Sequence, residues 1–258
     1  MTRYRQIWAW TRFTLSEYTR SGRIFLELGA FVVFAYIFLR KPNTNATLTF
    51  TQFFGMVSVF VLAQTIYTTS ILVSMGNRAQ GYVVLARPLG RKGYLVGLWL
   101  TAVLIGVGNL LLCSLVAALV NPAQNLSATP GIVIWLLGAL PLVLDIALVA
   151  ALVLFLSGLV LSSGWRLVML SVLALASVGS TDVFSKIVNV DGPVSRILAA
   201  IRTLVALPLT PLLAGFELSV QRLYSPQAVA ILLGQIALLV AVLAFAMFSF
   251  DRRDIILN

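Results

Sequence analysis

Four polar side chains lie inside long apolar runs, where they could contact a substrate, an ion or a proton: Gln64, Asn109, Asp145 and Gln235. A charged residue at the centre of a bilayer costs at least about 2.5–3.5 kcal/mol, so Asp145 should face protein or a water-filled cavity. Its carboxyl could be a substrate or ion contact, or a proton acceptor. Alternatively, Asp145 is protonated, or is hydrogen-bonded to Asn109 or a threonine hydroxyl, and only holds helices together.

The runs around these residues are long enough to cross a bilayer. No charged residue occurs between Lys41 and Arg78, or between Lys92 and Asp145. An α-helix of about 20 apolar residues crosses a hydrocarbon core of about 30 Å. Since hydrophobic residues make up 60% and charged residues 10% of the 258 positions, we predict an all-α polytopic membrane protein.

Several kinds of chemistry lack their residues in this sequence. There is no histidine, which excludes His-ligated haem, histidine-bearing zinc motifs and any imidazole triad. The single Cys113 cannot form an intrachain disulfide. No G-x-x-x-x-G-K-[ST] phosphate loop and no close pair of carboxylates occurs in an apolar run. An intramembrane enzyme would therefore have no recognisable nucleophile and base.

The net charge of +10 reflects basic residues at the ends of the apolar runs, so topology and anionic lipid explain it better than nucleic acid does. Residues 1–23 form the first basic segment and are predicted to be an amphipathic helix lying in the membrane interface. At about 100° per residue, one face of this helix carries Tyr4, Ile7, Trp8, Thr11, Leu15 and Tyr18, and the opposite face carries Arg5, Arg12, Ser16 and Arg20.

Residues 24–258 are predicted to form a domain of six transmembrane helices. The expected spans are 24–39, a segment within 50–75, 94–120, 132–161, a short fifth span after Arg166, and 228–250. The fifth span has a reach of about 22 Å before Asp182, so it needs snorkelling side chains or a thinned bilayer. Residues 182–225, broken by prolines, are expected to be extracytoplasmic, with short outer-leaflet or re-entrant helices that pack against protein.

Six spans place both termini on one side of the membrane. Most of the 18 Lys and Arg residues fall on that side, in the amino-terminal segment, the loop 76–93 and the carboxyl-terminal tail. By the positive-inside rule, both termini are expected in the cytoplasm.

The loop 76–93 carries glycine and basic residues in a distinctive order. It runs through Gly76, Arg78, Gly81, Tyr82 and Leu85 to Arg87-Pro88-Leu89-Gly90-Arg91, and re-enters the membrane at Tyr94-Leu95-Val96-Gly97. This order resembles the first cytoplasmic loop of ABC-2 type transporter permeases. A basic helix before the first span, six spans, a broken stretch before the last span and the Phe-x-Arg-Arg-Asp ending at 250–254 are also similar to that family.

The resemblance implies a permease subunit that is not itself an enzyme and binds no cofactor. A cytoplasmic P-loop ATPase would bind ATP and Mg²⁺, and a second permease chain, identical or related, would complete an exporter in the inner (cytoplasmic) membrane. The loop would be the coupling helix, with force transmitted through Arg78, Gly81, Arg87, Pro88, Arg91 and Lys92. Many family members carry an acidic residue ahead of the loop glycine, and residues 77–80 here contain none.

The interfacial helix, with Arg5, Trp8, Arg12 and Arg20, would be the connecting helix beside the coupling helix. An alternative function is a secondary carrier driven by a proton or ion gradient through Asp145. Internal repeats, which many carriers have, are not visible, and only one acid lies deep in a span. Neither the cargo nor the symmetry of the permease pair follows from the sequence.

Overall fold

The computed structural model describes residues 3–39, 48–76, 90–120, 132–161, 164, 166–168, 209–221 and 226–252. Within these ranges every regular element is a helix and no strand occurs, which confirms the predicted all-α class. The helices are α1 (Arg3–Arg20), α2 (Ile24–Phe34) continued by the π-helical turn η1 (Ala35–Leu39), α3 (Phe50–Gly76), α5 (Gly90–Val120), α6 (Ile132–Phe155), α10 (Thr210–Gln221) and α11 (Pro226–Arg252).

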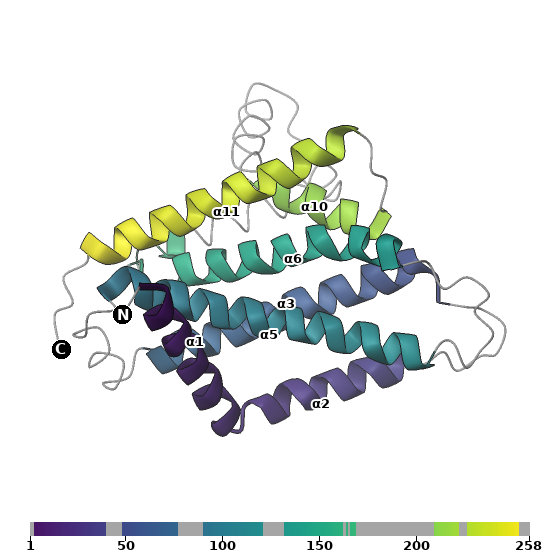
Figure 1. The fold of residues 1–258 in the computed structure, drawn as a ribbon, viewed down its shortest axis with the longest axis horizontal. Helices are drawn as coiled ribbons and strands as arrows, with labels where there is room; N and C mark the ends of the chain where they lie inside the picture. Colours follow the sequence, from purple (N-terminus) through teal and green to yellow (C-terminus); the bar gives the residue numbers. More distant parts are fainter. Residues whose placement is uncertain are drawn as a thin grey trace, which may run out of the picture.

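The long helices α3, α5, α6 and α11 lie side by side along the long axis of the molecule (Figure 1). α1 crosses their ends on the side where α11 ends, and packs against α5. It meets α2 at a bend of 73°. Gly22 occupies this turn with a φ of 73°, a left-handed conformation that glycine adopts without steric penalty.

Within the part of the chain that the structure describes, four helices are long and apolar enough to cross a membrane: Phe50–Met75, Gly90–Val120, Trp135–Phe155 and Gln227–Asp251. The 11 residues of α2 and the 5 of η1 reach only about 24 Å together, and they qualify as a fifth span only when α1 is counted with them as a bent pair. The predicted span after Arg166 lies mostly outside the described residues. The count of six spans is therefore not confirmed.

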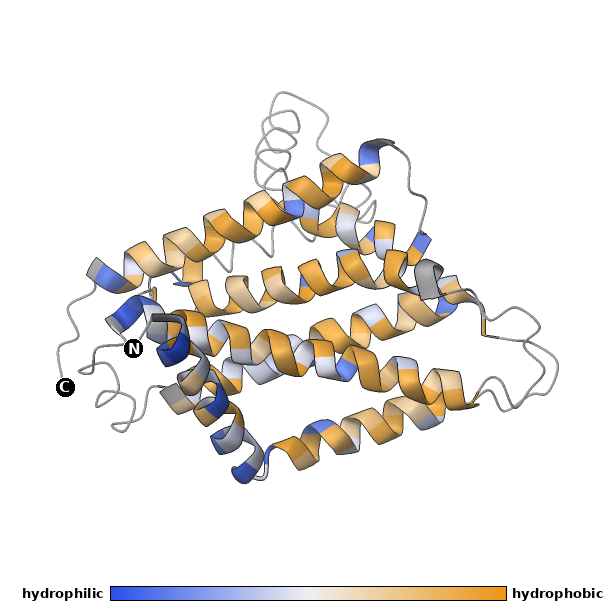
Figure 2. Ribbon diagram, viewed as in Figure 1, coloured by the Kyte–Doolittle hydropathy of each residue, from blue (hydrophilic) through white to orange (hydrophobic). Residues whose placement is uncertain are grey.

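The surface of the helices has the polarity expected in lipid. Apolar residues cover the long helices, whereas hydrophilic residues gather on α1 and at helix ends (Figure 2). α11, for example, exposes several large apolar side chains, namely Val229, Leu233, Ile236, Val240, Phe245 and Phe248. Exposed apolar surface of this extent is rare in soluble monomers. The chain is therefore a multi-pass membrane protein.

Among the described residues, two clusters of buried apolar side chains hold the bundle together. The cluster far from α1 centres on aromatic residues, with the rings of Phe34 and Phe60 stacked at 4.0 Å. The cluster near α1 joins five helices, and includes Tyr18, Leu72, Tyr94, Leu95, Leu154 and Phe250. The carboxyl-terminal ends of α6 and α11 both lie in this second cluster. These two helices therefore run in the same direction.

α10 is a short helix within the stretch 182–225 that was predicted to contain such helices. It packs against α3, α6 and α11, and it buries Gly215, Leu218 and Ser219 against them. Residues 182–208 and 222–225 lie outside the described ranges. Whether α10 is re-entrant stays a prediction.

α1 is seated on α5 by aromatic packing. The ring of Trp10 stacks on Tyr94 at 5.1 Å, directly over Gly97, where a Cβ atom would overlap Cδ1 of the Trp10 ring. Glycine therefore permits the close approach of the two helices.

The face of α1 that was predicted to meet lipid is only partly exposed. Tyr4 is 86% and Trp8 is 52% exposed, but Thr11 and Tyr18 are buried. The buried face is rotated towards Trp10 and Thr14 because α1 packs against α5. The side chains of Arg5, Arg12 and Arg20 are exposed, and their contact with headgroups stays a prediction.

The substitution Gly97→Ala should loosen α1 from α5. Overpacking of this kind costs about 1–3 kcal/mol, so we expect a lower thermal midpoint and faster tryptic cleavage after Arg12 in the purified protein. The matched control is Gly108→Ala in the same helix, where an added Cβ meets nothing within 4 Å. Equal behaviour of the two variants would contradict the proposed seat of α1.

Candidate functional site

Asp145 and Gln235 form a polar pair between α6 and α11. Nε2 of Gln235 donates a hydrogen bond to Oδ1 of Asp145 at 2.6 Å and another to the backbone carbonyl of Pro141 at 3.3 Å. Both side chains are 0% exposed. The pair therefore joins two helices in surroundings that exclude solvent, where a hydrogen bond is stronger than in water.

Two oxygens of this pair have no hydrogen-bond partner: Oδ2 of Asp145 and Oε1 of Gln235. Buried polar atoms are nearly always hydrogen-bonded in folded proteins, and leaving one unsatisfied costs about 1–3 kcal/mol. Because the Asp145 carboxyl and the Gln235 amide each keep an unsatisfied acceptor, a hydrogen-bond donor is missing between them.

α10 covers the pair with its backbone. A Cβ at Gly215 would overlap the Gln235 amide and lie 3.0 Å from Oδ1 of Asp145, so only glycine fits there. One turn later, Oγ of Ser219 donates to the backbone carbonyl of Gly138 in α6 at 3.0 Å. These contacts hold α10 directly over the carboxyl group.

A second polar cluster joins α2, α3 and α5. Oγ1 of Thr68 donates a hydrogen bond to the Glu27 carboxylate, and Nε2 of Gln64 donates to the backbone carbonyl of Glu27 at 3.2 Å. Nδ2 of Asn109 then donates to Oε1 of Gln64 at 2.5 Å. The side chain of Glu27 is 5% exposed, so this carboxyl is also removed from solvent.

Tyr18, at the end of α1, is 0% exposed and lies near Glu27. Burial raises the pKa of the Tyr18 hydroxyl above its usual value, and the neighbouring Glu27 carboxylate raises it further. The hydroxyl therefore stays protonated and presents a proton donor at the bend between α1 and α2.

The four predicted pathway residues fall into two separate pairs. Gln64 contacts Asn109, and Asp145 contacts Gln235. The alternative that pairs Asp145 with Asn109 or with a threonine is wrong, because α11 supplies its partner. A role of these residues in a cargo pathway stays a prediction.

Sequence reasoning did not assign Glu27, Thr68 or Gly215 to a site. Glu27 is the acid at the start of an apolar run, and Gln64 and Thr68 are spaced i, i+4 on one face of α3. That spacing could have indicated a shared partner. No sequence signal marks Gly215 as the residue that covers Asp145.

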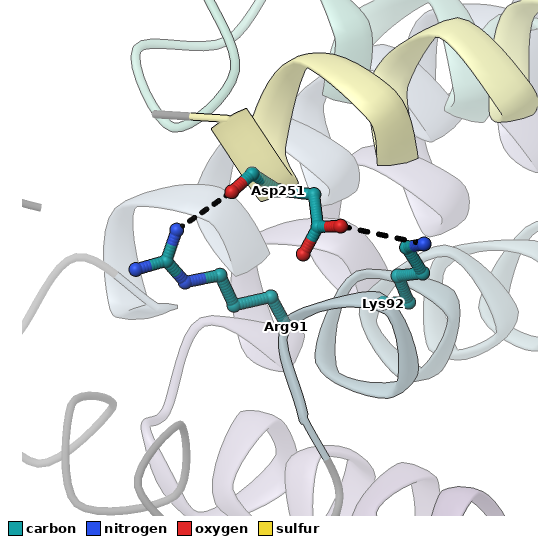
Figure 3. A network of polar contacts seen from close by, with 3 residues as sticks. All are labelled: Arg91, Lys92 and Asp251. Atoms are coloured by element: carbon teal, nitrogen blue, oxygen red, sulfur yellow. Dashed lines mark hydrogen bonds and ion pairs between the residues drawn. The ribbon is translucent and has the colours of Figure 1, made fainter. Parts of the chain in front are cut away.

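The predicted coupling residues are only partly described. Arg78, Gly81, Arg87 and Pro88 lie outside the described residues. Arg91 and Lys92 stand in the first turn of α5 and hold the end of α11 through Asp251 (Figure 3). Nη1 of Arg91 donates to the Asp251 backbone carbonyl at 2.9 Å, and Nζ of Lys92 lies 3.4 Å from its carboxylate.

The Lys92–Asp251 ion pair is weak by itself, since its side chains are 63% and 50% exposed and such pairs contribute about 0–1 kcal/mol. Apolar packing beside it is more substantial. The ring of Tyr94 stacks between Trp10 at 5.1 Å and Phe250 at 6.5 Å. Together these contacts join α1, the start of α5 and the end of α11, and we call this set the end platform.

Among the described residues, no group of three or more Cys, Asp or Glu side chains could hold a metal ion. Comparisons of the chain with protein-family models, with curated proteins and with solved structures found no match.

The substitution Gln235→Leu should destabilise the protein by about 1–3 kcal/mol, because it leaves the buried Asp145 carboxyl without its donor. The double variant Asp145→Leu/Gln235→Leu should recover most of this loss, since neither buried polar group remains. Thermal unfolding in detergent measures both effects. The control Gln227→Leu makes the same change at an exposed position of α11. Additive losses in the double variant would show that the pair does not interact.

Proposed function

We propose that this chain is the membrane-spanning permease subunit of an ATP-driven ABC-2 type exporter. A separate cytoplasmic ATPase would supply the energy, and a second permease chain would complete the transport path. The order of residues in the loop 76–93, its Arg-Pro-Leu-Gly-Arg segment and the 250–254 ending favour this family over other multi-pass membrane proteins.

The end platform is the observation that carries this function. The loop 77–89 joins the last residue of α3 to the first residue of α5. Arg91, Lys92 and Tyr94 then connect the start of α5 to α11 and α1. A partner that displaces the loop would therefore move three helices together, as energy coupling requires.

The direction of the helices supports the expected topology. α6 and α11 run the same way, which is expected if one further span lies between them. Six spans would place both termini at the end of the bundle where α1 lies. The basic residues of α1 favour the cytoplasm for that end.

ATP binding by the partner would then tilt α5 and α11 relative to α6 and change the access to the interior polar pairs. Gln64–Asn109 and Asp145–Gln235 lie at helix contacts that this motion would alter. Both are neutral or acidic and neither includes a basic residue, so they offer no site for pairing with an anionic group.

The substitution Arg87→Glu should weaken ATPase association, because it reverses a charge within the proposed docking loop. Co-purification from native membranes measures this, with membrane insertion checked by fractionation. The matched control is Arg40→Glu, a charge reversal directly after η1. Arg40 follows the first predicted span, so it is expected on the side of the membrane opposite to the docking loop.

Asp145→Asn should leave ATPase association intact, since Asp145 is buried between α6, α10 and α11. If Arg87→Glu co-purifies as well as the wild type, the assignment of the docking loop fails. If no ATPase co-purifies with any variant, a gradient-driven carrier becomes the better account.

A further inference from the structure

Asp145 is a buried acid that forms no ion pair with any residue that the structure describes. Its side chain is 0% exposed, and its hydrogen-bond donor is the neutral amide of Gln235. An ionised carboxylate that is removed from water without a charged partner is strongly unfavourable, and such a group takes up a proton instead.

The other ionisable side chains on the surrounding helices do not compensate this charge. α3 contains no charged residue, and Asp145 is the sole charged residue of α6. Glu217 of α10 is exposed. Asp251, near the end of α11, pairs with Lys92. α5, which also packs against α6, carries Arg91 and Lys92 in its first turn, where both contact Asp251. Among the described side chains of these five helices, none forms an ion pair with Asp145.

A single proton, bound to one of the two unsatisfied oxygens of the pair, would form a hydrogen bond to the other. A carboxylic acid and a primary amide each present one donor and one acceptor on facing edges, so they can form two antiparallel hydrogen bonds. The first, from Nε2 of Gln235 to Oδ1 of Asp145, is present at 2.6 Å. The second needs a proton on Oδ2 of Asp145, donated to Oε1 of Gln235, and these are the two atoms that have no partner.

α10 closes this site. The backbone at Gly215 lies so near that a Cβ would overlap the Gln235 amide and lie 3.0 Å from Oδ1 of Asp145. Water therefore cannot reach the pair from the side of α10 while α10 keeps this position. Ser219 and Pro211 hold α10 there through contacts with Gly138 and Gly234.

We propose that Asp145 and Gln235 form a proton-binding site inside the membrane domain, closed by Gly215 of α10. The proton is held on Oδ2 of Asp145, and it exchanges with solvent when α10 moves away. This site would make the position of α10 sensitive to protonation. It does not depend on the proposed ATPase partner, so the two can fail separately.

Infrared difference spectroscopy of the purified full-length chain tests the bound proton. At neutral pH, the wild-type spectrum minus that of Asp145→Asn should contain the carbonyl band of a protonated carboxylic acid. Carboxylate bands in that difference would overturn the proposal and would indicate an ionised group or a bound cation. Glu27→Gln provides the corresponding difference for the second buried carboxyl.

Labelling with a hydrophobic carbodiimide, which reacts with protonated carboxylic acids, tests the closure and does not need an Asp145 variant. Gly215→Ala should displace α10 or Gln235 and raise the rate of labelling at Asp145 several-fold, as measured by mass spectrometry of peptides. Gly108→Ala, which meets nothing within 4 Å, should label at the wild-type rate. No labelling in Gly215→Ala would contradict a protonated Asp145, and equal rates in all three proteins would contradict closure by α10.

Discussion

A hydrocarbon interior offers no hydrogen-bond partner, so each polar side chain on a membrane span has to find its partner within the protein. This constraint determines which helices of the chain are joined. Gln64 of α3 meets Asn109 of α5 and the backbone of Glu27 in α2, and Asp145 of α6 meets Gln235 of α11. Each of the candidate spans in the described structure takes part in one of these contacts. The same polar groups that are costly in lipid therefore fix the arrangement of the bundle.

Close approach of the helices depends on small residues, because apolar side chains gain little by leaving lipid for protein. Gly106 brings α5 against Ile146 and Thr65, and Gly138 receives the ring of Phe54. Gly215 lets α10 lie over Asp145. The polarity of the molecule differs between one end of the bundle and its interior. One end is charged and joins α1, α5 and α11 in the end platform, whereas the interior is apolar with isolated polar pairs.

Composition and the position of apolar runs were sufficient to predict the four long helices α3, α5, α6 and α11. The span expected within 50–75 matches α3, which begins at Phe50 and ends at Gly76, because lipid requires long uninterrupted apolar segments. The pairing of the polar residues could not be predicted in this way. Helical spacing shows which face carries Asp145 but not which helix lies against that face, so Gln235 was recognised as polar without being recognised as its partner. The role of Gly215 depends on α10 packing across two other helices, which no local pattern encodes.

The end platform and the interior pairs have a common explanation if a partner acts on the loop before α5 and the spans respond. The most direct measurement is to tag the chain, solubilise it from native membranes in mild detergent and identify what co-purifies. We expect a P-loop ATPase in stoichiometric amount, with ATP hydrolysis that is sensitive to vanadate. A chain that purifies alone while such ATPases are abundant in the same membranes would contradict it.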